Sequence, residues 1–175
     1  MRANKSDRSP TVNLNRNGFS VFELLIVIII IGIIIAVAIP ASKPLIENIR
    51  LMTTANAIKH KLYMAKTRAL GDPLIHCGVV FDTTNKPNTV QAFLDNGIPV
   101  GNNMYDPLND HVFMAPYVLP NTITMQVSGT VNPNVVIFRG DGSAKIPGLT
   151  LTITNGQNKS KRITVLPSTG RIKLY

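Results

Sequence analysis

Hydrophobic residues fill one long run near the N-terminus. From Phe19 to Ile39 this run is interrupted only by Ser20, Glu23 and Gly32. At about 1.5 Å per residue, a helix of 21 residues spans roughly 32 Å, which matches the hydrocarbon core of a bilayer. Residues 19–39 are therefore predicted to form a single transmembrane helix.

Residues 40–70 keep a helical pattern, but they are apolar on one side only. Their apolar positions lie three or four residues apart, which predicts an amphipathic helix that continues the membrane segment into a globular part. Pro40 and Pro44 are expected to bend the join, and Gly71 to Pro73 are expected to end the helix. The apolar positions are Leu45, Ile49, Met52, Ala55, Ile58, Leu62, Ala65 and Ala69.

Residues 71–175 change to short apolar or alternating runs separated by Asn, Gly, Pro and Asp, a pattern typical of strands and turns. Residues 95–111 are interpreted as a long loop, and 155–158 as the turn of a hairpin. A long helix followed by antiparallel strands predicts an α+β fold, in which a β-rich head covers the apolar face of the helix. The predicted strands are 74–81, 89–94, 116–127, 134–138, 149–154, 161–166 and 170–175.

The segment before the apolar run is polar, and its four basic residues face one acid, Asp7. The positive-inside rule therefore places the N-terminus in the cytoplasm and the head across the membrane. A secretory signal peptide would have a shorter apolar run and a small-residue cleavage site, which is not evident at residues 40–42. An ordinary membrane anchor does not explain Glu23, because a carboxylate within a span is costly and usually marks a functional partner.

Residues 17–25, which read NGFSVFELL, resemble the class III signal of type IV pilins and pseudopilins. The resemblance implies that a prepilin peptidase removes residues 1–18 as a leader, cutting between Gly18 and Phe19, and methylates the new amine of Phe19. Glu23 would then be the fifth residue of the mature chain. The resemblance also implies a pilin-like fold, a single pass through the bacterial inner membrane with the head in the periplasm, and assembly with other pilin or pseudopilin subunits into a filament.

Physical reasoning gives Glu23 a role in that assembly. In a helix bundle within lipid, the amine of a neighbouring subunit's Phe19 would neutralise the carboxylate. Such a pair would set the register of subunits as they join the filament. The alternative is a carboxylate that only reaches toward the membrane surface.

Two later segments resemble the pseudopilin H and FimT group of this family. Residues 138–142 are similar to the group's F-x-x-x-G segment. Residues 170–173, which read GRIK, are similar to the Gly-Arg-x-Arg motif with which FimT-like minor pilins bind DNA during natural transformation. Lys173 replaces the last arginine of that motif, which keeps the charge but loses the bidentate fork of a guanidinium group.

Charge gathers in the same C-terminal region. The chain has 18 Lys and Arg against 9 Asp and Glu, a formal net charge of +9. Residues 139–175 hold seven basic residues against Asp141 alone, whereas residues 19–138 are balanced. A basic patch can contact phosphates without reading a base sequence. The candidate DNA-binding residues are Arg171, Lys173, Lys159, Lys161 and Arg162.

Arg171 and Lys173 alternate along a predicted strand, so both side chains are expected on one face, which Lys161 and the nearby loop would extend. A solvated basic edge that deters sheet aggregation is the alternative. The basic side of the helix is interpreted as plain solvated surface, and it comprises Lys59, Lys61, Lys66 and Arg68.

No pattern assembles a catalytic site, so we expect no enzymatic activity, cofactor or metal. His60, His76 and His111 lie far apart, and Cys77 lies in an apolar run where a thiol is expected to be buried and inert. Asp141 lacks the lysine of a phosphate loop and the alternating acids of a calcium loop, so it is predicted to lie in a turn.

Two functions remain open from the sequence. The first is a minor type IV pilin of the FimT kind, a filament subunit that binds double-stranded DNA for natural transformation. The second is a minor H-type pseudopilin with a structural role in the pseudopilus of a type II secretion system. A membrane-anchored enzyme is a third class that no residue supports. DNA binding by the head separates the first two.

Overall fold

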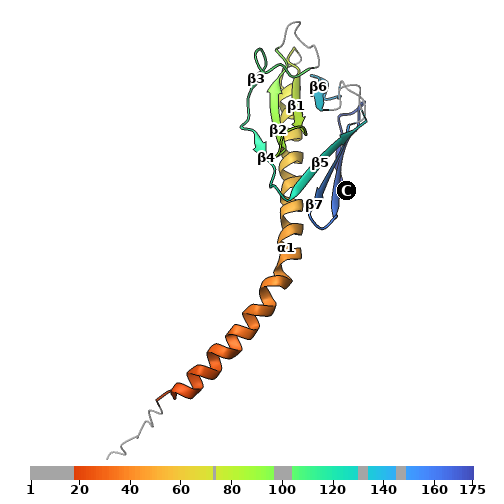
Figure 1. Cartoon of the computed structure of the whole chain (residues 1–175). Helices are drawn as coiled ribbons and strands as arrows, with labels where there is room; N and C mark the ends of the chain where they lie inside the picture. The colour runs from red at the N-terminus through yellow and green to blue at the C-terminus, as the bar shows by residue number, and fades with distance from the viewer. Residues whose placement is uncertain (1–17, 73, 97–103, 130–133, 145–148) are drawn as a thin grey trace, which may run out of the picture. The chain divides into compact units, whose positions relative to one another are not determined.

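A computed structural model describes residues 18–72, 74–96, 104–129, 134–144 and 149–175. The chain divides into two compact units, Met1–Ala41 and Ser42–Tyr175. One helix, α1 (Val21–Leu70), runs through the boundary between them, and the nine strands of the described residues all follow it (Figure 1). Of the predicted leader, all but Gly18 lies outside the described residues.

The described part of the first unit is the start of α1. Ser20 Oγ accepts a hydrogen bond from the backbone N–H of Phe22 at 3.3 Å, and Glu23 Oε2 accepts one from the N–H of Ser20 at 2.9 Å. This reciprocal arrangement is a capping box, which satisfies amides that the first turn of a helix leaves free. The Glu23 side chain therefore stabilises the first turn of α1, in addition to the role in assembly that the sequence predicts.

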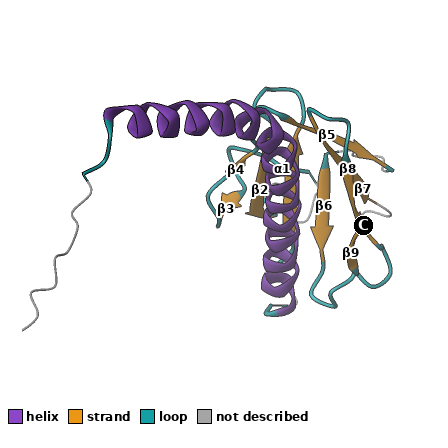
Figure 2. Cartoon of the chain, turned by 90° about the horizontal axis from the view of Figure 1, so that it is seen from below, coloured by secondary structure: helices purple, strands orange, loops and turns teal. Residues whose placement is uncertain are grey.

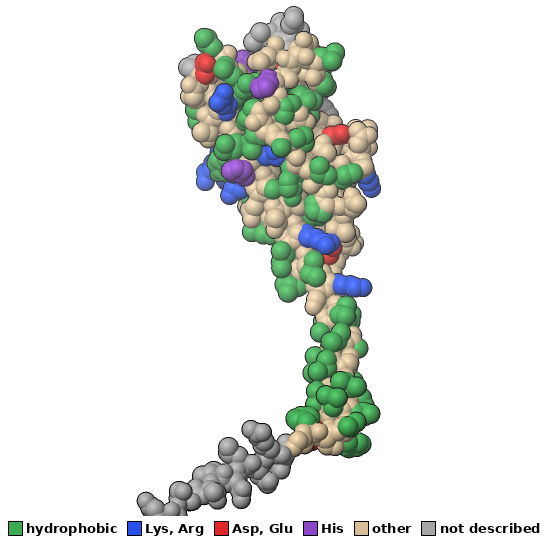
Figure 3. All heavy atoms as spheres, turned by 90° about the vertical axis from the view of Figure 1, so that its left-hand side faces the viewer, with side chains coloured by type: hydrophobic (Ala, Val, Ile, Leu, Met, Phe, Trp, Pro, Cys, Tyr) green, Lys and Arg blue, Asp and Glu red, His purple; other side chains and the backbone are tan. Residues whose placement is uncertain are grey.

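Apolar side chains of the first unit are exposed along α1 at consecutive positions and therefore all round the helix, and Figure 3 shows one side of this apolar surface. A helix that is apolar all round needs an apolar surrounding. Among the described residues, α1 is the one helix that is long and apolar enough to cross a membrane.

In the second unit, the C-terminal part of α1 packs against the strands. The predicted buried positions from Ala55 onward are confirmed, with spacings of three and four. Leu45, Ile49 and Met52 are exposed instead, and Leu51 is the first buried residue of the helix. The helical period identifies the buried face from Ala55 onward, but toward the N-terminus this face continues through Leu51 and not through Met52.

Lys61 is not part of a solvated surface, contrary to the prediction. It is buried, and its Nζ donates a hydrogen bond to the carbonyl of Ala115 at 2.6 Å. Desolvation by burial lowers the pKa of Lys61. A lysine beside the packed face can bury its methylene stem while a backbone carbonyl satisfies its ammonium group.

The strands form two antiparallel sheets, as the α+β prediction requires. The first sheet has the order β3 (His111–Val112), β2 (Thr89–Leu94), β1 (Cys77–Asp82) and β6 (Val135–Phe138), and β4 (Tyr117–Val118) also pairs with β2. The second sheet has the order β5 (Ile123–Ser128), β7 (Leu149–Asn155), β8 (Ser160–Val165) and β9 (Ile172–Leu174). Figure 2 shows α1 in front of the strands, with β2 and β3 on one side of it and β6, β8 and β9 on the other.

The predicted strand 116–127 is instead two strands, β4 and β5, which belong to different sheets. Pro120 lies between them and accepts a hydrogen bond from Ile123 N at 2.9 Å in a turn. Proline has no N–H for a sheet ladder, which explains the interruption. Strand β3 begins at His111, the last residue of the predicted loop 95–111, of which residues 97–103 lie outside the described residues.

The core lies between α1 and the inner faces of both sheets. Ile153 of β7, Ile163 of β8 and Phe81 of β1 are fully buried within it. Cys77 lies in the same cluster, so its predicted burial is confirmed. Burial raises the pKa of the Cys77 thiol to about 11, and the reactive thiolate is therefore scarce at neutral pH.

Candidate nucleic-acid interface

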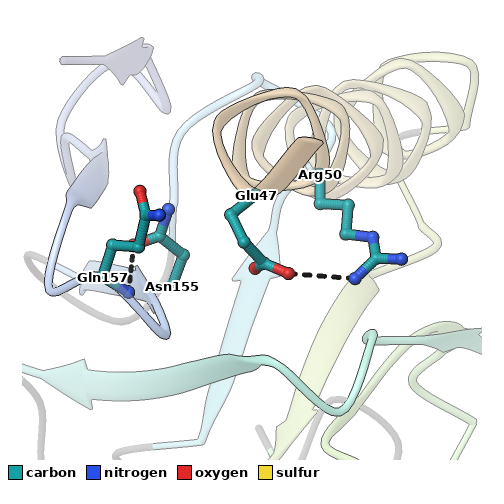
Figure 4. Close-up of polar contacts among 4 residues, drawn as sticks. All are labelled: Glu47, Arg50, Asn155 and Gln157. Carbon is teal, nitrogen blue, oxygen red and sulfur yellow. Dashed lines mark hydrogen bonds and ion pairs between the residues drawn. The ribbon is translucent and has the colours of Figure 1, made fainter. Parts of the chain in front are cut away.

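The hairpin between β7 and β8 positions the first of the basic candidates. Asn155 Oδ1 accepts hydrogen bonds from Gln157 N at 3.1 Å (Figure 4) and from Lys159 N at 3.0 Å. Asn158 adopts a φ of 60°, a left-handed conformation in which asparagine is enriched. These contacts close the predicted turn and leave the side chain of Lys159 exposed in it.

Strand β8 separates two of the candidates onto opposite faces of the second sheet. Ile163 and Val165 face the core and are buried. Because side chains alternate along a strand, Arg162 projects away from the core, whereas Lys161 lies on the core side and is half-buried. The expectation that Lys161 extends the face of Arg171 and Lys173 is therefore wrong, because a residue next to Arg162 in the chain lies on the other side of the sheet.

Strand β9 and the residue before it place two more basic side chains on the same face of the sheet as Arg162. Lys173 is paired with Thr164, which lies two residues after Arg162 on the same face. Arg171 precedes β9 and continues the register, since its carbonyl accepts a hydrogen bond from Leu166 N at 2.9 Å. Arg162, Arg171 and Lys173 thus gather on the side of the second sheet that faces away from the core, called the outer face below.

Two glycines fix the point where β9 begins. Gly170 is buried with a φ of +55°, and a Cβ atom there would clash with the carbonyl oxygen of Gly142. Residues 138–142 and 170–173, the two segments that resemble family motifs, therefore pack against each other. Only a residue without a side chain permits this approach of two backbones, so the glycine of the second motif has a structural role.

Asp141 lies in a turn directly before Gly142, as predicted. Its Oδ1 accepts hydrogen bonds from Ser143 Oγ at 2.6 Å and from Ser143 N at 2.8 Å. The side-chain bond from Ser143, followed by the backbone bond, lowers the pKa of Asp141. In the part of the chain that the structure describes, no group of three or more His, Cys, Asp or Glu residues lies close enough to hold a metal ion.

Helix α1 contacts the start of β9 and the residues before it. Tyr63 Oη donates a hydrogen bond to the carbonyl of Ile172 at 3.5 Å, and Lys66 Nζ donates to the carbonyls of Thr169 at 2.8 Å and Gly170 at 3.1 Å. Of these three carbonyls, that of Ile172 belongs to β9 and the other two precede it. The contacts therefore tie the beginning of the basic strand to the helix.

The N-terminal segment matches a known family. Residues 13–39 match the family described as the prokaryotic N-terminal methylation motif. This span includes Gly18, Phe19 and Glu23. A comparison with curated proteins found no match.

Two solved structures share the fold. The minor pseudopilin EpsH from the type 2 secretion system of Vibrio cholerae has a TM-score of 0.52 and 14% sequence identity, over 72% of this chain and 96% of EpsH. The type IV minor pilin FimU of Pseudomonas aeruginosa has a TM-score of 0.50 and 16% identity, over 74% of this chain and 90% of FimU. The chain thus joins the N-terminal methylation motif to a fold found in a minor pseudopilin and a minor pilin, and it is type IV pilin-like in both parts.

Proposed function

We propose that the chain is a minor type IV pilin of the FimT kind, a filament subunit that binds double-stranded DNA for natural transformation. A prepilin peptidase cuts between Gly18 and Phe19 and methylates Phe19. The helix over residues 19–39 then stays in the bacterial inner membrane, with the N-terminus in the cytoplasm and the head in the periplasm. Glu23 pairs with a neighbouring pilin subunit during assembly.

The methylation motif and the exposed apolar surface of α1 support the first part of this proposal. Cleavage after Gly18 leaves Ser20 and Glu23 in place, so the capping box that begins α1 persists in the mature chain. The helix therefore keeps its start when the leader is removed.

One observation carries the proposal of DNA binding. Arg162, Arg171 and Lys173 lie on one face of the second sheet, and Lys159 is exposed in the adjoining hairpin. Basic side chains without an acid among them attract a polyanion and give phosphate contacts that do not depend on base sequence.

The test is a titration of unrelated DNA duplexes with the mature chain in an uncharged detergent, repeated over a range of salt concentrations. Each phosphate contact contributes about −0.9 to the slope of log K against log salt. With three or four contacts the slope is expected to be about −3 to −4, and affinity should not depend on sequence. Arg171→Gln combined with Lys173→Gln should flatten the slope by about 2.

Arg68→Gln is the matched control for Arg171→Gln, because Arg68 is also an exposed arginine but lies on α1. The control should leave the slope unchanged. Equal effects of the two arginine substitutions would indicate attraction by overall charge without a site. Lys61 does not serve as a control, because it is buried and bonded to Ala115.

A minor H-type pseudopilin with a structural role in a type II secretion system is the second candidate. The fold is shared with EpsH as well as with FimU, and Lys173 departs from the Gly-Arg-x-Arg pattern. Absence of DNA binding by the wild-type chain at low salt would favour this second function over the first.

A further inference from the structure

Hydroxyl groups line the outer face beyond its basic residues. Strand register places every second residue of β5, β7 and β8 on this face, and the alternate residues are buried or half-buried toward the core. The outer-face residues are Thr124, Gln126 and Ser128 of β5, Thr150, Thr152 and Thr154 of β7, Ser160, Arg162 and Thr164 of β8, Lys173 of β9, Arg171 before it and Tyr175 after it.

The threonines of β7 have unused hydrogen-bonding capacity. Ser128 Oγ donates to the carbonyl of Thr150 at 3.3 Å, and Thr124 Oγ1 donates to that of Thr154 at 3.4 Å. Within the described residues, by contrast, the hydroxyls of Thr150, Thr152 and Thr154 have no bonded partner. All three are half-buried and still accessible, so they present a row of donors at every second position of one strand.

The composition of this face is unusual for an exposed sheet. Threonine is favoured in strands, which explains its presence at single positions. It does not explain a face on which every charged side chain among the described residues is basic. Tyr175, which exchanges backbone hydrogen bonds with Arg162, adds one exposed aromatic ring at the end of this face. Carboxylates would repel a polyanion, whereas lysine, arginine and hydroxyl side chains suit phosphate oxygens.

We infer that the hydroxyls of β7 bind the second phosphate backbone of a DNA duplex whose first backbone lies on Arg171 and Lys173. The inference rests on the proposed DNA-binding function. Strand β7 is two strands from β9, a distance of about 10 Å, and the long basic side chains reach further outward. Across the minor groove, whose free width of about 6 Å excludes the phosphate groups themselves, the phosphates of the two backbones are about 12 Å apart. Hydroxyl and cationic contacts can thus be made at the same time.

The cationic contacts and the hydroxyl contacts affect the salt dependence of DNA binding differently. Lysine and arginine release counterions from phosphate, so they determine the salt dependence of binding. A neutral hydroxyl adds a hydrogen bond to phosphate but releases no counterion, so it changes affinity without changing the salt slope. A single strand has one backbone and can bind on the basic residues alone, whereas a duplex placed in this way contacts the basic residues with one backbone and the hydroxyls with the other. The threonines should therefore matter for duplexes and little for single strands.

The test compares duplex and single-stranded DNA of equal length, with the mature chain in an uncharged detergent. Thr150→Val with Thr152→Val removes two hydroxyls and keeps two β-branched side chains. We expect this pair to weaken duplex binding about tenfold, at about 0.5–1.5 kcal/mol per hydrogen bond, with the salt slope unchanged. Binding of single strands should change less than about twofold.

Two controls accompany the pair. Thr150→Ser with Thr152→Ser keeps both hydroxyls and should bind duplex like the wild type. Thr53→Val with Thr67→Val makes the same chemical change at exposed positions of α1 and should have no effect. Thermal unfolding of each variant verifies that the fold is kept.

The outcomes separate this inference from the function on which it rests. If the wild-type chain binds no DNA, the proposed function fails and this inference with it. If the wild type binds duplex DNA and the valine pair binds equally well, only the inference fails. Equal weakening for duplex and single strands would overturn the assignment to a second backbone. Altered self-association in ultracentrifugation with unchanged DNA binding would instead assign the face to contacts between copies of the chain.

Discussion

Gly170 shows how a single residue determines the position of a charged strand. Its left-handed backbone and its contact with the carbonyl of Gly142 bring β9 beside β8 with Arg171 and Lys173 outward. Lys66 also holds Gly170 in place, because its Nζ donates a hydrogen bond to the carbonyl of Gly170. The glycine in this motif therefore positions the strand, and the charges that follow it are free to contact a ligand.

Gly170→Ala is expected to lower the free energy of unfolding by about 2–4 kcal/mol, because a side chain there combines an unfavourable φ with a clash against backbone that cannot move aside. Thermal or denaturant unfolding of the mature chain measures the change. Gly156→Ala is the matched control, since Gly156 is exposed in the β7–β8 hairpin with no atom near its Cβ position. It should change stability by less than about 0.5 kcal/mol. Equal stability of both variants would contradict the role assigned to Gly170.

At the scale of elements, helical and strand periods predicted most of the fold from the sequence. The end of α1 at Leu70 and the hairpin after Asn155 are where glycine and asparagine signals placed them. The features that were missed depend on contacts between distant segments. Burial of Lys61 depends on the carbonyl of Ala115, which no local pattern reveals. The face of Lys161 depends on strand register, because a shift of one residue reverses every side chain.

Glu23 caps the start of α1, and the same carboxylate is the group proposed to pair with a neighbouring subunit. The spacing of Ser20 and Glu23 is a capping-box signature that is visible in the sequence, and the structure contains hydrogen bonds from both side chains to backbone amides. The two roles differ in chemistry, because capping needs a hydrogen-bond acceptor, whereas the proposed pairing needs a negative charge.

Two substitutions of Glu23 separate these roles. Glu23→Gln keeps an acceptor for the N–H of Ser20 and removes the charge, whereas Glu23→Ala removes both. Both variants should insert into the membrane, since each removes a costly charge from an apolar span. If charge pairing drives assembly, both should be depleted from sheared filaments relative to the membrane fraction in quantitative immunoblots. Normal incorporation of the glutamine variant alone would show that the cap is what assembly requires.

For the whole molecule, the proposed leader cleavage would determine whether the head can leave the membrane in a filament. Residues 1–18 hold four basic residues, which by the positive-inside rule are expected to keep the N-terminus on the cytoplasmic side. With these residues present, the chain is expected to remain a membrane protein with its head in the periplasm. The proposed cleavage would expose the amine of Phe19 and so supply the positive charge for pairing with a neighbouring Glu23.

Mass spectrometry of the membrane-extracted protein is therefore expected to show a mature chain that begins at methylated Phe19. Gly18→Glu should block this cleavage, because the peptidase would have to accept a bulky charged side chain at the cut site, and the uncleaved chain should be absent from filaments. Gly18→Ala adds a single methyl group and should still be cleaved, which controls for loss of the glycine itself. Intact Met1 at steady state in cells with an active prepilin peptidase would contradict the assignment of residues 1–18 as a leader, and with it the proposed route of this subunit into a filament.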